Sequence, residues 1–206
     1  MVTLYLINQP ESTWMKEERC EGQSDTSLTA LGKAQSKKIA NQLRQQTISS
    51  LYTSNLHRAN QCARIIATII PLKIKRDGRL GDINLGLWQG KFPEEIENRY
   101  PEVWANWKRD PLSAIIPDGE KLDEVVVRVD SFLKSLIDDE LFDKNVIVIT
   151  HDIIIRTILA CLDGKSAVAI WDYTLDKASI SEVQIQPEKR IIQFNKTDHL
   201  YVPSFT

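Results

Sequence analysis

Residues 145–162, NVIVITHDIIIRTILACL, decide the fold. The run from Val146 to Ile149 is apolar throughout, which is typical of a central strand covered on both faces. The segment from Asp152 to Leu162 is apolar nearly all round and predicts a buried helix. A buried strand that leads directly into a buried helix indicates an α/β protein.

The rest of the chain alternates between the same two kinds of element. Further strands are predicted at residues 3–7, 50–53, 72–75, 179–186 and 190–195, and further helices at 29–46, 59–70 and 122–136. The last two strands alternate apolar and polar residues around Pro187-Glu188-Lys189, which indicates an antiparallel hairpin at a sheet edge. We therefore predict a three-layer α/β/α sandwich with a mostly parallel six-stranded sheet and an antiparallel edge.

Size and charge narrow the class of protein. A chain of 206 residues suffices for one well-packed core, so we expect a single domain over 1–206. The formal net charge of −2 gives no overall attraction to nucleic acid or to an anionic membrane, and we expect neither as a partner. The sequence has no basic leader and no apolar stretch of roughly 18 residues, which favours a cytoplasmic protein.

Cysteine usage gives no sign of a structural cross-link. Cys20, Cys62 and Cys161 are far apart and form no CxxC pair. Cys62 and Cys161 lie in apolar helical patterns, where a free cysteine is usually a small buried hydrophobe. We therefore expect no disulfide framework, no metal site and no cofactor.

The stretch 86–117 interrupts the alternation of strands and helices. It is rich in proline and contains Trp88, Trp104 and Trp107. We interpret it as an inserted excursion over the carboxyl ends of the strands. An alternative is that Trp104 and Trp107 simply pack the insertion onto the body, and both interpretations hold together.

Polar clusters follow several of the predicted strands. They are Asn8 to Ser12, Asn55 to Arg58, Asp82 with Asn84, and His151 with Asp152. Because the carboxyl ends of parallel strands share one edge of a sheet, we expect these clusters to converge.

Six segments, in this order, resemble the histidine phosphatase superfamily, whose fold is phosphoglycerate mutase-like. They are NQPES with Trp14 two residues on, DTSLTALGKAQSKKIANQL, LYTSNLHRANQCARII, LGDINLGLWQG, YPEVWANWKRDP followed by PDGE, and VIVITHDIIIRTILA. The resemblance runs from about residue 3 to residue 164. Each segment is weak evidence alone, but six in order strongly favour the fold.

The resemblance implies a phosphate site in which the usual nucleophile is missing. Gln9 stands where the family has the histidine that attacks phosphorus, and Asn8 stands where it has a phosphate-binding arginine. Arg58 and His151 match two phosphate ligands, and Asp82 matches the acid that protonates the leaving group. Ser12 completes the predicted set of phosphate-binding residues, which is Asn8, Ser12, Arg58 and His151.

The chemistry of these substitutions predicts lost turnover. Imidazole has a basic lone pair near neutral pH, whereas the amide nitrogen of Gln9 has its lone pair delocalised into the carbonyl. Asn8 and Gln9 also remove cationic capacity, and Asp152 adds an anion beside His151. Pro10 replaces a flexible family glycine with a fixed φ. We predict a pseudophosphatase, for which the candidate ligands are a phosphorylated small molecule, another anion or a protein partner.

Two other functions remain open. One is an active phosphomonoesterase that uses a relocated nucleophile such as His57, or water assisted by Asp82. The other is a structural domain with an empty pocket. Each site residue also has a purely structural interpretation: Arg58 as a salt bridge to Asp82 or Glu11, and His151 as a buried core histidine. His199 is predicted to lie in a polar surface tail over 195–206.

Overall fold

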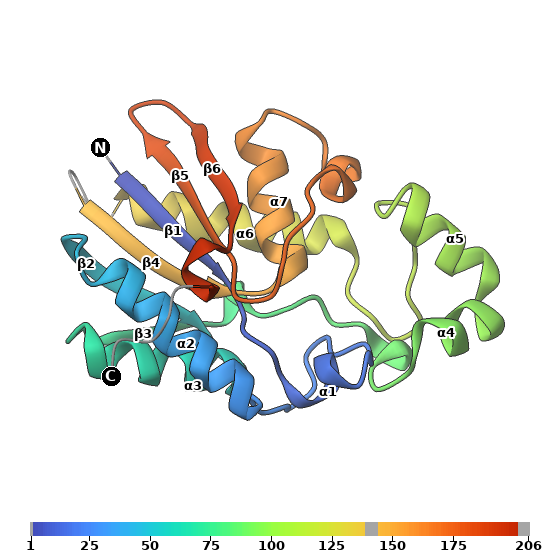
Figure 1. Cartoon of the computed structure of the whole chain (residues 1–206). Coiled ribbons are helices and arrows are strands. Elements are labelled where there is room, and N and C mark those ends of the chain that lie inside the picture. The colour runs from blue at the N-terminus through green and yellow to red at the C-terminus, as the bar shows by residue number, and fades with distance from the viewer. Residues whose placement is uncertain (1, 139–143, 202–206) are drawn as a thin grey trace.

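The computed structural model describes residues 2–138 and 144–201, which include a six-stranded sheet (Figure 1). The strands are β1 (Val2–Asn8), β2 (Ile48–Ser54), β3 (Ile74–Asp77), β4 (Lys144–Thr150), β5 (Ile180–Gln186) and β6 (Arg190–Lys196). Their order is β3-β2-β4-β1-β5-β6. The first four strands pair in parallel, whereas β5 and β6 pair antiparallel, as predicted.

Helices cover both faces of this sheet. The longer ones are α2 (Ala30–Leu43), α3 (His57–Ile69), α6 (Leu122–Asp138) and α7 (Asp152–Leu162). The shorter ones are α1 (Thr13–Lys16), α4 (Pro93–Arg99) and α5 (Pro101–Arg109), with 3₁₀ turns η1 (Gly78–Leu80), η2 (Gly86–Trp88), η3 (Ala167–Asp172) and η4 (Asp198–Leu200).

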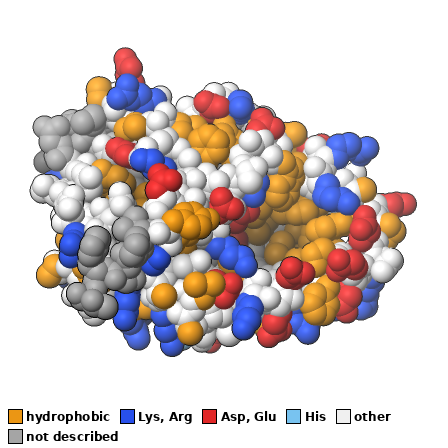
Figure 2. All heavy atoms as spheres, viewed as in Figure 1, with side chains coloured by type: hydrophobic (Ala, Val, Ile, Leu, Met, Phe, Trp, Pro, Cys, Tyr) orange, Lys and Arg blue, Asp and Glu red, His pale blue; other side chains and the backbone are white. Residues whose placement is uncertain are grey.

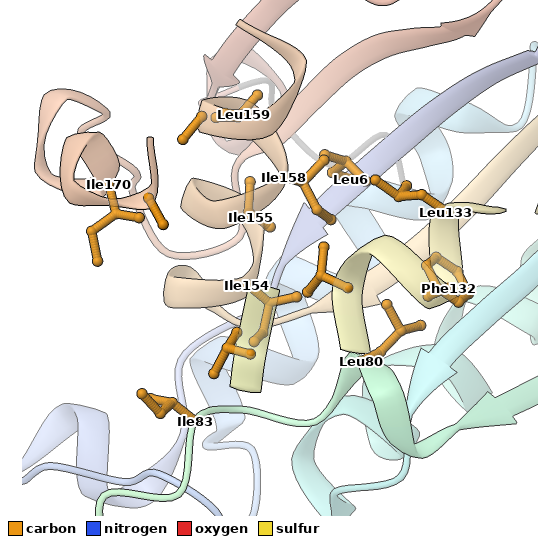
Figure 3. Close-up of a cluster of buried hydrophobic side chains, with 14 of the residues drawn as sticks. Leu6, Leu80, Ile83, Phe132, Leu133, Ile154, Ile155, Ile158, Leu159 and Ile170 are labelled. Atoms are coloured by element: carbon orange, nitrogen blue, oxygen red, sulfur yellow. The ribbon is translucent and has the colours of Figure 1, made fainter. Parts of the chain in front are cut away.

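Alternate residues of β1 explain the three layers. Leu4 and Leu6 belong to the apolar cluster that contains the buried faces of α6 and α7, whereas Tyr5 and Ile7 belong to the cluster of α2 and α3. Figure 3 shows the first of these clusters, where Leu6 lies near Ile158 of α7 and Leu133 of α6. Side chains of a strand alternate between faces, so each helix pair has its own apolar surface.

The central position of β4 follows from its apolar run. Residues Val146 to Thr150 are buried, and Val148 pairs with Leu6 of β1 on one side and Tyr52 of β2 on the other. The edge strand β3 starts at Ile74, two residues later than the predicted start at 72. Its residues are mostly polar and none is fully buried, so apolar spacing marks its bounds poorly.

The excursion over 86–117 is fixed to the body through indole rings. Trp107 contacts Trp88 and Trp171 edge-to-face, with ring centroids 6.3 Å and 5.4 Å away. The indole nitrogen of Trp171 donates a hydrogen bond of 2.8 Å to the backbone oxygen of Trp107. The packing interpretation of Trp107 is therefore confirmed, and Figure 1 shows α4 and α5 beyond the carboxyl ends of the parallel strands.

The prediction for His199 was wrong. This residue is 5% exposed, and its Nε2 lies 3.0 Å from the backbone oxygen of Ala178. Lys38 of α2 donates a hydrogen bond to the backbone oxygen of Leu200, which also holds η4 against the rest of the domain. Both contacts use backbone oxygens, and sequence patterns do not reveal such contacts. Residues 202–206 of the predicted tail lie outside the described part of the chain.

The described residues contain neither a membrane-spanning helix nor a cluster of metal-ligating side chains. None of the helices there is long and apolar enough to cross a lipid bilayer. Within the same ranges, no group of three or more His, Cys, Asp or Glu side chains is placed to hold a metal ion. Cys20, Cys62 and Cys161 are free thiols.

Candidate active site

The structure brings the main predicted site residues together at the carboxyl ends of the parallel strands. Asn8 ends β1 and precedes Gln9, Arg58 lies in the first turn of α3 directly after β2, and His151 follows β4. Asp82 follows η1, and its carboxylate lies 3.3 Å from the guanidinium of Arg58. The convergence expected from the strand order is therefore confirmed.

Arg58 is the cation at the centre of this cluster, and its side chain is completely buried. A guanidinium has five N–H donors and no acceptor. Six acceptors surround its nitrogens: Gln9 Oε1 at 2.5 Å, Gly22 O at 2.6 Å, Ser24 O at 2.9 Å, Asp82 Oδ2 at 3.3 Å, His151 Nδ1 at 3.4 Å and Thr26 Oγ1 at 3.5 Å. Atoms of the protein itself therefore occupy every donor of Arg58.

Glu21 is a site residue that the sequence analysis missed. It is 8% exposed, and its carboxylate lies 3.5 Å from Nε of Arg58. It accepts hydrogen bonds of 2.7 Å from Gln9 Nε2 and from the Thr26 hydroxyl, and another from the Ser12 hydroxyl. Neutral donors and a guanidinium thus surround this carboxylate, as they would surround a bound oxyanion.

The loop that carries Glu21 is held in shape by a glycine and by the excursion. Gly22 has φ +52, and a Cβ there would lie 2.6 Å from the side chain of Gln89. Cys20 pairs with the excursion through two backbone hydrogen bonds, one to Lys91 O and one from Gly90 N. The loop has no apolar periodicity, so the only signal for Glu21 in the sequence was an acidic residue shortly after the first motif.

His151 is buried and uncharged. Burial, followed by the positive charges of Arg58 and Arg128, holds its pKa well below the ordinary value of 6.5. Because the guanidinium of Arg58 can only donate, we assign Nδ1 as an acceptor and place the proton on Nε2, 2.9 Å from Ser54 Oγ. His151 is therefore a neutral neighbour of Arg58 and adds no positive charge to the site near pH 7.

Asp82 is the titratable group of the site. Burial raises its pKa to about 7, although Arg58 and the backbone N–H of Ile83 both favour the charged form. The nearby carboxylates of Glu21 and Asp152 add to the rise. A carboxyl group with such a pKa exchanges its proton near neutral pH, which is what general acid–base chemistry requires.

Other predicted neighbours make contacts away from the centre. Asn8 donates 2.9 Å to Asp176 O, so its amide donor points to the backbone rather than to a ligand site. Asp152, predicted to oppose His151, instead pairs with Arg156 at 2.7 Å. Glu11 makes no ion pair with Arg58 and lies 3.9 Å from Lys177. The side chain of His57 is exposed.

A cleft of about 240 Å³ opens beside the cluster. The charged residues that line it are Arg19, Glu21, Asp82 and Asp152. Its apolar walls contain Met15, Leu85, Trp88, Trp104, Trp107 and Ile153. Figure 2 shows an apolar hollow between the excursion and the body of the molecule, with acidic side chains around it.

Comparison with known proteins gives one consistent result. The model of the histidine phosphatase superfamily (branch 1) matches residues 4–197. Phosphoserine phosphatase 1 of Hydrogenobacter thermophilus is 30% identical over 201 residues, which cover 97% of this chain and 95% of that protein. The probable phosphoglycerate mutase GpmB of Yersinia enterocolitica is 30% identical over 190 residues, which cover 90% and 86% of the two chains.

A solved structure supports the same fold. Bacillus stearothermophilus YhfR matches with a TM-score of 0.91 at 24% identity, over 97% of this chain and 100% of that chain. The two relatives and the solved structure each match most of this chain. They agree with the resemblance of the six sequence segments to the same superfamily.

Proposed function

This chain belongs to the histidine phosphatase superfamily, and from that premise we propose that it is a pseudophosphatase. In this proposal the protein keeps the fold and the layout of the site but forms no phosphohistidine. The observation that carries the proposal is the contact of Gln9 with both Arg58 and Glu21.

The first argument is the chemistry at position 9. Gln9 uses its oxygen as an acceptor for Arg58 and its nitrogen as a donor to Glu21. Neither atom has a basic lone pair that is free to attack phosphorus. Loss of a nucleophile that acts within a catalytic unit costs on the order of a millionfold in turnover. A remaining general acid, which contributes roughly 10²–10⁴-fold, does not offset that loss.

The second argument is the charge of the pocket. Glu21 and Asp82 both lie against Arg58, and His151 is neutral. A phosphate dianion would have to displace Glu21 from its donors and would enter next to two carboxyl groups. Like charges at such distances cost free energy, so we expect poor binding of phosphate.

The retained role in this proposal is binding without turnover. The candidate ligands remain those predicted from the sequence: a phosphorylated small molecule, another anion or a protein partner. Arg58 is already paired with Glu21. A ligand that leaves this ion pair intact is therefore favoured over a ligand that has to bind the guanidinium itself.

One observation favours a second candidate function. The pKa of Asp82 is about 7, so this carboxyl group is able to donate or accept a proton at neutral pH. With water as the nucleophile, Asp82 would make the protein an active phosphomonoesterase. The named phosphatase among its relatives adds to this candidate.

Hydrolysis and oxyanion binding together distinguish the two candidates. We would assay wild-type protein on p-nitrophenyl phosphate and phosphoserine, and record its melting temperature with added vanadate. The pseudophosphatase predicts no hydrolysis above the buffer rate and no vanadate-dependent rise in melting temperature.

The matched variants for the assay are Asp82→Asn and Asp130→Asn. Asp130 is half-exposed on α6 and pairs with Lys134, away from the site. Turnover that survives Asp130→Asn and disappears in Asp82→Asn would establish the phosphomonoesterase and exclude the pseudophosphatase.

A further inference from the structure

The net charge of −2, from which we expected no attraction to nucleic acid, is the sum of two unlike parts of the chain. Residues 26–76 contain nine of the 26 lysines and arginines and none of the 28 acidic residues. The remaining sequence has 17 cationic and 28 acidic residues. A charge asymmetry of this kind indicates a surface for a polyanion, which the total charge of the chain does not reveal.

The fold gathers this acid-free stretch on one side of the molecule. Residues 26–76 include α2, β2, α3 and most of β3. The two helices pack against each other on the same face of the sheet, and β2 and β3 are the strands at that edge. Figure 1 shows α2 and α3 next to each other, and Figure 2 shows Lys and Arg side chains along the lower left of the same view. The cations of this stretch therefore share one surface.

Six exposed cations of this stretch define what we call the basic face. They are Lys33, Lys37 and Arg44 at α2, Arg64 of α3, Lys73 before β3, and Arg76 of β3. The three at α2 follow one another at i, i+4 and i+11, which places them along one stripe about 16 Å long. Among the described residues none of the six forms an ion pair, whereas the exposed Lys108 and Lys134 outside this stretch do. The positive charge of the basic face is therefore not balanced by nearby carboxylates.

The side chains between these cations favour one class of polyanion. The exposed neutral polar side chains near the end of α2 are the amides of Asn41, Gln42 and Gln45, and Leu31 is the one large apolar side chain exposed within residues 26–76. Binding to a lipid surface grows with the apolar area that enters it, and interfaces between proteins are rich in aromatic residues and poor in lysine. Interfaces with DNA are polar and strongly positive, and amides as well as cations contact phosphate and sugar.

The same stretch favours a double helix over a single strand. Proteins that bind single strands stack the bases on aromatic side chains. Residues 26–76 contain no Phe or Trp, and their one tyrosine, Tyr52, is buried. The basic face therefore suits a ligand that presents its phosphates and keeps its bases paired.

We propose that the basic face binds the phosphate backbone of double-stranded DNA without reading its sequence. Each exposed cation that contacts a phosphate releases counterions from the DNA, and this release supplies the affinity. None of the six cations belongs to the candidate active site, so the proposal goes beyond the proposed function and is tested separately from it.

Fluorescence anisotropy of a labelled DNA duplex of about 24 base pairs tests the proposal over a range of roughly 25–200 mM NaCl. With about four to six phosphate contacts, log K should fall with log [NaCl] with a slope of roughly −3.5 to −5.5. Two duplexes of unrelated sequence should bind equally, and a single strand of the same length should bind more weakly. No binding at about 25 mM NaCl and 100 μM protein, a slope near zero, or tighter binding of the single strand would overturn the proposal.

Variants locate the binding surface. Lys33→Gln/Lys37→Gln removes two cations of the stripe, so it should weaken binding by about tenfold or more and make the salt slope shallower by about 2. Lys108→Gln/Lys134→Gln is the matched control, because it changes the net charge by the same amount on exposed residues outside the basic face. It should keep the wild-type slope. Equal weakening in the control, or a wild-type slope in Lys33→Gln/Lys37→Gln, would contradict the assignment.

Competition separates DNA from the other polyanions. The competitors are unlabelled duplex, polyglutamate, and phosphatidylcholine vesicles with about 30% phosphatidylserine, compared at equal concentration of negative charge. We expect the unlabelled duplex to displace the probe at the lowest concentration. Displacement at a lower concentration by the vesicles would assign the basic face to a membrane, and by polyglutamate to an acidic protein. Either result would overturn the proposal.

Discussion

The amide of Gln9 and the carboxylate of Glu21 are hydrogen-bonded over 2.7 Å in the buried centre of the site. The oxygen of the same amide accepts from Arg58, so Gln9 joins the buried cation to its buried counter-ion. The residue at the nucleophile position therefore has a structural role that a substitution at Glu21 or Arg58 should reveal.

Replacing Glu21 with glutamine should open the pocket to an oxyanion. The substitution removes the negative charge that occupies the donors of Ser12 and Thr26 and keeps the size of the side chain. We expect vanadate to raise the melting temperature of Glu21→Gln and to bind it at least about tenfold more tightly than wild type, or ~1.4 kcal/mol.

Glu97→Gln is the matched control, because Glu97 is exposed and pairs with Lys108 on the surface. It should respond to vanadate as wild type does. If Glu21→Gln also behaves like wild type, the carboxylate is not what excludes the anion.

Removing the guanidinium of Arg58 should destabilise the protein strongly. Arg58→Met leaves Glu21 and Asp82 buried without their cation, and breaking a buried ion pair costs about 3–5 kcal/mol. Urea unfolding measures the loss. The double variant Arg58→Met/Glu21→Gln should recover part of it, because the uncompensated charge of Glu21 is gone.

Arg109→Met serves as the control, since Arg109 is exposed and hydrogen-bonds only Asn106 among the described residues. A loss of similar size in that variant, or a double variant no more stable than Arg58→Met, would show that the charge of Glu21 is not the cause.

The fold was predictable because its elements have strong local patterns. The apolar run at Val146 to Ile149 marks the central strand, and the hairpin around Pro187 marks the antiparallel edge. The positions of Arg58 and His151 follow from the same patterns, because both come directly after parallel strands that end at one edge of the sheet.

The contacts inside the site were not predictable in the same way. Glu21 lies in an irregular loop, and its place beside Arg58 depends on the positive φ of Gly22 and on backbone pairing with the excursion. The charge expected beside His151 was assigned to Asp152 from adjacency in sequence, whereas that side chain pairs with Arg156 one turn along α7. Sequence neighbours show which residues are near, but not which atoms they contact.

Restoring the family motif should require Glu21 to change as well. The triple variant Asn8→Arg/Gln9→His/Pro10→Gly supplies a nucleophile and a cation but leaves the carboxylate in the pocket. We expect the quadruple variant with Glu21→Gln to form phosphohistidine from phosphoserine at least about tenfold faster than the triple variant. Phosphorus NMR of the acid-labile adduct measures both rates, and equal rates would contradict an obstructive role for Glu21.

The stability of the protein should depend on pH through Asp82. Its pKa is about 7 in the folded protein and near 3.8 when exposed. Between these values the folded state holds a proton that the unfolded state has lost, so stability falls as pH rises. The interval corresponds to roughly 4 kcal/mol at most. His151 acts in the opposite direction, because its lowered pKa makes stability fall as pH drops below about 6.5.

Comparing Asp82→Asn with wild type isolates the contribution of Asp82, because His151 is present in both proteins. The groups that act on Asp82 are Arg58, the backbone N–H of Ile83, Glu21 and Asp152, and none of them is changed. Near pH 4 the protonated acid and the amide are alike in charge, so the two proteins should have similar free energies of unfolding. As pH rises to about 8, the variant should become progressively more stable than wild type, because only wild type has to bury a second carboxylate beside Arg58. Urea unfolding at several pH values measures the difference, and a difference that is constant with pH would mean that Asp82 is already ionised in the folded protein at low pH.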